Sequence, residues 1–151
     1  MLRIGLISDT HGLLRPQVLA FLRGSDHILH AGDICEPAVL AQLRTLAPVT
    51  AVRGNNDLGP WAQELQETET VVFGAVRIHM VHDLAELGRG WQATGVQAVV
   101  SGHSHRPRVE QRNGVLWINP GSAGPRRFKL PISAGELLVD GASVSARLVE
   151  F

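Results

Sequence analysis

The strongest constraint on the fold is the alternation of apolar runs and helix-period segments in the first half of the chain. Three short runs have the length and composition of buried strands, at residues 2–8, 26–32 and 48–54. Two segments between them carry apolar residues at helical spacing, at 15–24 and 36–47. A strand-helix-strand-helix-strand order predicts a parallel sheet with right-handed crossovers.

The second half of the chain is richer in strands. Strand-like segments lie at 64–73, 75–82, 97–102 and 114–119, and a hairpin spans 135–151. Between them, the first part of 83–95 has a helical pattern. No repeat or linker divides the chain. We therefore expect a single domain over 1–151, α/β in its first half and α+β in its second, with two packed sheets flanked by helices.

Composition excludes several classes of protein. The chain has 151 residues with 14 basic and 14 acidic side chains, so its formal net charge is zero. That balance argues against a stable nucleic-acid binder or a membrane-surface protein, because those partners select a basic face. The lone Cys35 excludes an internal disulfide and fits a reducing compartment, which predicts a cytoplasmic protein. No apolar run reaches the ~18 residues of a membrane span.

Metal-competent side chains follow five of the strand-like segments. They are Asp9 and His11, Asp33, Asn55, His82, and His103 and His105. The carboxyl ends of parallel strands meet at one edge of a sheet, so these side chains are predicted to gather there. Residues two apart in an extended segment face the same way, which lets each close pair clamp one ion. Gly32, Gly54 and Gly102 precede ligands and are predicted to supply positive-φ turns.

Seven side chains suit two octahedral ions that share a bridging carboxylate. Four imidazoles among the oxygen ligands favour Mn²⁺, Fe²⁺, Ni²⁺ or Zn²⁺ over Mg²⁺ and Ca²⁺, which prefer oxygen alone. Two such ions ~3.5–4 Å apart can activate a bridging hydroxide at neutral pH and bind the oxygens of a phosphate ester. The sequence contains neither a phosphate-binding GxxxxGK[ST] loop nor a GxSxG nucleophile motif.

The order Asp-x-His, Gly-Asp, Gly-Asn-x-Asp, His and Gly-His-x-His resembles the calcineurin-like metallophosphoesterases. The segments His30–Asp33 and Asn119–Ser122 are similar to the compact bacterial and archaeal phosphodiesterase branch, which is related to a retromer subunit. The resemblance implies a four-layer αββα sandwich. It also implies two ligand shells bridged by Asp33: Asp9, His11 and His105 for one metal, and Asn55, His82 and His103 for the other.

The predicted function is a cytoplasmic phosphodiesterase that attacks a small phosphodiester with a hydroxide bridging two divalent ions, Mn²⁺ first among them. Asn55 is also expected to contact a phosphate oxygen. Asn56 stands where many superfamily members have a histidine that protonates the leaving group, so Asp57 becomes a candidate acid or supporting residue. Alternatives are a phosphomonoesterase, a cyclic-nucleotide hydrolase, or a non-catalytic interaction scaffold of the same fold.

Several residues near these motifs allow two interpretations. Asp83 either orients a histidine ligand or caps the following helix, with the cap favoured. The basic run at 126–129 is either a solvated loop or an electrostatic guide for phosphate. Arg53 and Arg106 flank ligands and are within possible reach of a phosphate. The alternating last strand at 143–151 is an edge that could pair with a second copy of the chain.

Overall fold

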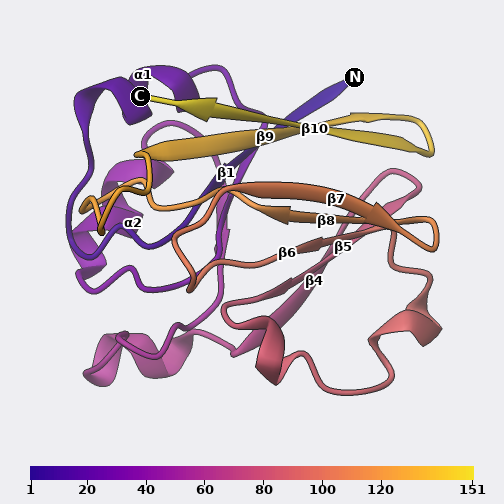
Figure 1. Ribbon diagram of the computed structural model, residues 1–151, viewed down its shortest axis with the longest axis horizontal. Coiled ribbons are helices and arrows are strands. Elements are labelled where there is room, and N and C mark those ends of the chain that lie inside the picture. The colour runs from indigo at the N-terminus through magenta and orange to yellow at the C-terminus, as the bar shows by residue number, and fades with distance from the viewer.

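The computed structural model describes residues 1–151, apart from the side chain of Ala93. Two five-stranded mixed sheets pack face to face (Figure 1). Sheet A has the order β10-β9-β1-β2-β3, formed by β1 (Leu2–Ile7), β2 (His27–His30), β3 (Val49–Ala51), β9 (Ser133–Asp140) and β10 (Ser143–Glu150). The three strands nearest the N-terminus are parallel, and the last two are antiparallel to their neighbours, as the sequence predicts.

Two helices cover the outer face of sheet A. They are α1 (Pro16–Leu22) and α2 (Pro37–Arg44), within the predicted helical segments. Both begin at a proline, whose fixed φ suits the first helical turn. Their apolar faces form a buried cluster with the outer side chains of the sheet, which includes Leu22, Ile28 and Leu43. Each such side chain contributes roughly 1.5–3 kcal/mol when fully buried.

Sheet B has the order β4-β5-β6-β8-β7. Its strands are β4 (Thr68–Phe73), β5 (Val76–Val81), β6 (Ala98–Val100), β7 (Arg108–Arg112) and β8 (Val115–Asn119). Ile78, Met80 and Ile118 from this sheet share one core with Ile4 and Leu6 from sheet A. We infer from this shared core that residues 1–151 act as one domain.

Three details differ from the sequence prediction. The segment 83–95 forms only the short 3₁₀ helices η2 (Leu84–Glu86) and η3 (Trp91–Thr94), so the layer outside sheet B is thin. The predicted strand at 64–73 begins later, at Thr68, and the 3₁₀ helix η1 (Pro60–Glu64) takes its first residue. Strand β7 was not predicted, since its polar Arg-Val-Glu-Gln-Arg sequence is that of an exposed edge.

Two further observations concern partners. Strand β10 lies at the edge of sheet A, so pairing with a second copy through 143–151 stays a prediction. None of the helices in the described part of the chain has both the length and the apolar character needed to cross a membrane.

Candidate metal centre

The side chains predicted to bind metal are gathered where the strands of both sheets end. The segments that follow β1 and β2 bring Asp9, His11 and Asp33 together. The segments that follow β5 and β6 bring His82 and His105 to the same place from sheet B. Two groups of potential ligand atoms result, Asp9 with His11 and His105, and Asp9 with Asp33 and His82. The centre therefore lies at the strand ends where the two sheets meet.

Asp9 and Asp33 each face imidazoles from both groups. Asp9 Oδ1 lies 3.4 Å from His105 Nε2, 3.8 Å from His82 Nε2 and 4.0 Å from His11 Nε2. Asp33 Oδ2 lies 3.3 Å from His82 Nε2 and 3.6 Å from His11 Nε2. These separations are too long for hydrogen bonds of ordinary strength, but they suit ligand atoms that surround a cation.

Unpaired polar atoms test whether these residues fit a metal. Among the described residues, five buried side-chain nitrogen or oxygen atoms have no hydrogen-bond partner. Four of them belong to this centre: Asp9 Oδ1, His11 Nε2, His82 Nε2 and His105 Nδ1. Burying a polar group without a partner costs about 1–3 kcal/mol. Divalent cations between these groups would satisfy Asp9 Oδ1, His11 Nε2 and His82 Nε2, whereas His105 approaches Asp9 through Nε2 rather than Nδ1, so the donor set fits the expected metal.

Neighbouring groups orient His82 and Asp9 toward the centre. His82 Nδ1 lies 2.7 Å from the Ala31 carbonyl oxygen, which can only accept, so Nδ1 carries the proton and Nε2 is left as the ligand atom. Asp9 Oδ2 accepts hydrogen bonds from the Ser8 hydroxyl at 2.8 Å and from the His103 backbone N–H at 3.1 Å. That leaves Oδ1 turned toward the histidines. Ser8 carries no motif and was missed by the sequence analysis.

Asn56 supports Asp33 at both of its oxygens. The Asn56 backbone N–H donates to Oδ1 and its side-chain amide donates to Oδ2, each at 2.9 Å. Burial of Asp33 raises the pKa of its carboxyl, but the adjacent His82 imidazole and the Asn56 donors hold it well below the usual range. Burial of His82 lowers the pKa of its imidazole, but the carboxylates of Asp33 and Asp9 outweigh this effect and raise it.

Asn55 and His103 form the exposed part of the arrangement. His103 Nδ1 lies 3.1 Å from Asn55 Oδ1, and the side chain of His103 is 45% exposed. The rings of His82 and His103 are 5.2 Å apart. Asp83 caps η2, the role favoured from the sequence, because its Oδ1 accepts from the Ala85 N–H, whereas its Oδ2 lies 3.7 Å from His103 Nε2, too far for a hydrogen bond.

Asp57 lies beside the centre but does not point into it. One of its oxygens accepts from the backbone N–H groups of Asp33 and Gly54, and the other accepts from that of Cys35. The residue is 4% exposed. With its oxygens directed at three backbone donors, Asp57 ties the loop after β2 to the loop after β3. This geometry favours the supporting role over that of a general acid.

The backbone is strained at most of the predicted ligands. Five of the seven predicted metal-binding residues have φ between 45° and 72°: Asp9, His11, Asp33, His103 and His105. Non-glycine residues rarely adopt this left-handed region, and such strain clusters at functional sites. The prediction that the preceding glycines supply the positive φ holds for Gly32 alone. Gly54 and Gly102 are needed for space instead, since a Cβ there would collide with Asp33 and with Ser8.

A cleft of about 270 Å³ opens beside Asn55 and His82. Its lining includes the acidic residues Glu67, Asp83 and Glu86. Arg53 also lines it, with its guanidinium held by Glu67 at 3.0 Å. The cleft next to the exposed ligands is therefore acidic overall.

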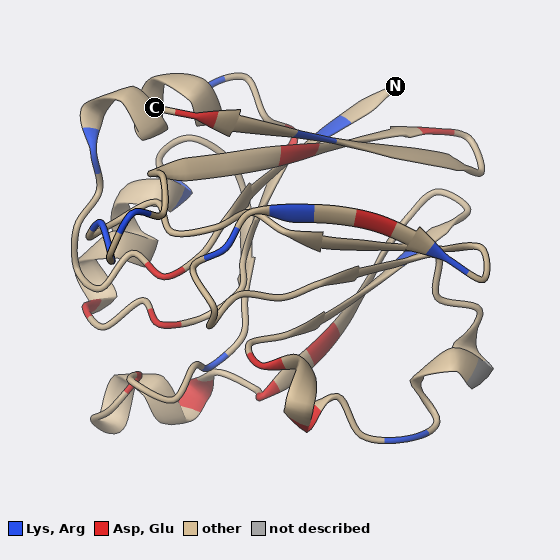
Figure 2. Cartoon of the chain, in the orientation of Figure 1, with Lys and Arg blue, Asp and Glu red and all other residues tan. Residues whose placement is uncertain are grey.

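Basic residues approach the centre from the loop between β8 and β9. Arg126, Arg127 and Lys129 are exposed there, and Figure 2 shows the blue segments of this loop at the left of the view. Burial lowers the pKa of His11, and the charge of Arg127 contributes in the same direction. The tip of this loop therefore presents positive charge near one group of ligands.

Comparisons with known proteins agree with the fold. A family model described as the calcineurin-like phosphoesterase superfamily domain matches residues 2–141. A probable metallophosphoesterase of Methanothermobacter thermautotrophicus is 31% identical, over 97% of this chain and 91% of the relative. A second one, of Methanocaldococcus jannaschii, is 34% identical over 79% of this chain and 67% of the relative.

Solved structures show the same architecture. Vps29 of Chaetomium thermophilum superposes with a TM-score of 0.85 at 20% identity, covering 99% of this chain and 87% of that one. Vps29 of Entamoeba histolytica, solved in complex with Zn²⁺, gives a TM-score of 0.79 at 24% identity and covers 99% of both chains. The four-layer arrangement expected from the sequence motifs is confirmed, although its outermost layer is thin. The chain therefore belongs to the calcineurin-like phosphoesterase superfamily.

Proposed function

We propose that this phosphoesterase is a phosphodiesterase that depends on two divalent metal ions, with Mn²⁺ as the favoured metal. The observation that carries the proposal is the set of buried, unpartnered ligand atoms on Asp9, His11 and His82, beside which His105 Nε2 lies 3.4 Å from Asp9 Oδ1. When bound, a pair of divalent ions supplies an activated water nucleophile and stabilises charge on the phosphoryl group. The single cysteine, Cys35, has no disulfide partner, which supports a cytoplasmic location.

The ligands divide into two shells in this proposal. Asp9, His11 and His105 hold one ion, which the mutual proximity of their ligand atoms supports. Asn55, His82 and His103 would hold the other, which requires the Asn55–His103 contact to open. Asp33 is the proposed bridge because its Oδ2 lies close to both His11 and His82.

The residues of the chain perform the binding and orienting steps. Asn55, which lines the cleft, donates its amide to a phosphate oxygen. The exposed guanidinium groups of the β8–β9 loop attract the anionic substrate toward the ligands. Asn56 cannot protonate a leaving group because a carboxamide does not ionise near neutral pH, and its amide donates to Asp33, so an ester with a good leaving group is favoured.

The acidic cleft favours a diester over a monoester. A phosphodiester carries one negative charge, whereas a phosphomonoester carries nearly two at neutral pH. The carboxylates around the cleft therefore repel a monoester more strongly than a diester. They belong to Glu67, Asp83 and Glu86. A small phosphodiester that places one of its substituents in this cleft is the proposed substrate class.

The test compares bis(4-nitrophenyl) phosphate with 4-nitrophenyl phosphate at matched concentrations, with Mn²⁺, Ni²⁺, Zn²⁺ or Mg²⁺ added. We expect Mn²⁺-dependent hydrolysis of the diester, its loss in Asp9→Ala and Asp33→Asn, and retention in Asp140→Asn, which lies at the far β9–β10 turn. Faster hydrolysis of the monoester would contradict the diester assignment. Full activity of both ligand variants would contradict the site.

An interaction scaffold is the second candidate function. The structural likeness to Vps29 proteins supports it at the level of the fold. In that case the purified protein would bind divalent ions without hydrolysing either ester under any of the four metals. Metal content measured on the same preparation separates this outcome from a protein that binds no metal.

A further inference from the structure

A second cavity, of about 410 Å³, lies on the outer face of sheet B. We name it the tryptophan pocket, lined by Trp91, Trp117, Gln92, Val96, Arg112 and Asn113, among others. Val96 precedes β6 and Asn113 precedes β8, whereas the metal ligands follow the ends of the strands. In Figure 1 the arrow of β8 points left and the β7–β8 turn lies at the right, so the pocket is at the opposite end of the sheet.

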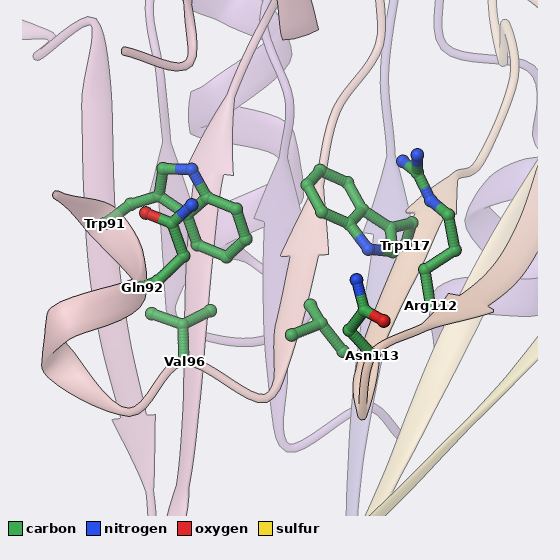
Figure 3. A pocket seen from close by; sticks show the side chains of 7 residues that line it. Trp91, Gln92, Val96, Arg112, Asn113 and Trp117 are labelled. Atoms are coloured by element: carbon green, nitrogen blue, oxygen red, sulfur yellow. The ribbon is translucent and has the colours of Figure 1, made fainter. Parts of the chain in front are cut away.

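The walls of the pocket are aromatic. Trp91 comes from η3, in the thin layer outside sheet B, and Trp117 comes from β8. Their rings meet edge to face, with centroids 5.2 Å apart and planes at 87°. The guanidinium carbon of Arg112 lies 4.7 Å from the centroid of Trp117 (Figure 3). Perpendicular indoles beside a cation form a surface on which a flat ring can stack.

The pocket contains one unsatisfied donor. Trp117 Nε1 is buried and has no hydrogen-bond partner, and it is the one such atom outside the metal centre among the described residues. An indole N–H can only donate, so it requires an acceptor. Figure 3 shows this nitrogen on the side of the cavity where Asn113 lies. Because this nitrogen is buried, a ligand oxygen reaches it only if the exposed side chain of Asn113 moves aside.

The charge of the lining defines the missing acceptor. Arg112 is the one charged residue among the described residues that line the pocket, and the amides of Gln92 and Asn113 lie beside it. Its Nε lies 3.4 Å from Glu110 Oε1, which leaves the terminal nitrogens available to a ligand. Flat apolar walls, one cation and one unpaired N–H together match a flat ring that bears an anionic oxygen group.

We propose that the tryptophan pocket binds a small planar aromatic carboxylate. The ring packs against the two perpendicular indoles, face to face with one and edge to face with the other, and the carboxylate accepts hydrogen bonds from Trp117 Nε1 and the Arg112 guanidinium. The cavity falls within the ~300–1,000 Å³ typical of small-molecule sites. The proposal does not depend on the phosphodiesterase proposal, since the pocket shares no residue with the metal centre or its cleft.

The experiment titrates naphthalene-2-carboxylate into the full chain and follows the indole N–H signals by ¹H–¹⁵N NMR. The chain has three tryptophans, so Trp61 is an internal reference outside the pocket. We expect the signals of Trp91 and Trp117 to shift and that of Trp61 to stay. The result should be the same whether diamagnetic Zn²⁺ or a chelator is present. No shift at about 1 mM probe would overturn the proposal.

Two related probes and three variants test the chemistry. Naphthalene-2-carboxamide lacks the charge and cyclohexanecarboxylate lacks the flat ring, so each should bind about tenfold more weakly or worse. Arg112→Gln and Trp117→Phe should weaken the binding of naphthalene-2-carboxylate by a similar factor. Arg108→Gln, on the same strand and also paired with Glu110, should leave it unchanged. Equal binding of the amide, or an equal loss in Arg108→Gln, would refute the carboxylate assignment.

Discussion

Asn56 donates to both oxygens of Asp33, one bond from its backbone N–H and one from its side-chain amide. The residue in the place of the expected catalytic histidine thus holds the proposed bridging ligand. Removing the side-chain donor in Asn56→Ala should weaken Mn²⁺ binding about 10–100-fold, as is usual for partners of metal ligands. Titration with Mn²⁺ followed by calorimetry measures this, with the exposed Gln111→Ala as the matched control. An unchanged affinity would show that Asp33 needs no support from the amide.

Asp57 should matter for stability more than for chemistry. Asp57→Ala leaves three backbone N–H groups without their acceptor, and each buried unsatisfied donor costs about 1–3 kcal/mol. We expect a loss of several kcal/mol in the free energy of unfolding, measured by urea denaturation of the metal-free protein. A normal stability with a lost or shifted alkaline limb of the pH–rate profile would instead identify Asp57 as a general acid, since a general acid must be protonated to act.

His30 makes the stability of the metal-free protein depend on pH. Burial lowers the pKa of this histidine from 6.5 to about 3, and Gly32 N–H donates to its Nδ1, so Nε2–H donates to Thr10. The contribution of a buried neutral histidine to the stability of the fold is complete above pH 6.5. As the pH falls from 6.5 toward 3, the histidine is protonated in the unfolded chain but not in the folded one, so this contribution is lost. The loss approaches ~1.4 kcal/mol per pH unit.

Urea denaturation between pH 7 and pH 5 checks this dependence, with the pH range set by the ordinary histidine pKa. His30→Gln does not titrate and should flatten the curve, while His27→Gln should change it less because His27 is only half-buried. Equal slopes for the wild type and His30→Gln would refute the assignment.

Gly102→Ala should disable the metal centre without unfolding the protein. The new Cβ would collide with the Ser8 hydroxyl and press on Asp9 Oδ2, the two groups that fix this ligand. We expect loss of Mn²⁺ binding with circular dichroism unchanged. Gly141→Ala has open space around its Cβ and pays only the cost of a positive φ, so it should bind Mn²⁺ normally. Normal binding by Gly102→Ala would mean that Ser8 moves freely.

Much of the fold follows from patterns that the sequence contains. The parallel strands, both helices and the final hairpin were predictable because apolar periodicity and turn residues decide them locally. Strand β7 and the thin layer at 83–95 were not, since a polar edge strand and 3₁₀ turns depend on contacts with the neighbouring β8 and on packing. In the candidate site, the sequence indicates which side chains meet but not what holds them. The roles of Asn56, Asp57 and Ser8 depend on loops that approach one another only in the folded chain.

The left-handed backbone at Asp9, His11, Asp33, His103 and His105 has a consequence for how ions bind. Amide and hydroxyl contacts of the protein itself hold these bends, so ions enter a frame that is already shaped. Metal binding is then expected to take place in the folded chain, without being needed to form these bends.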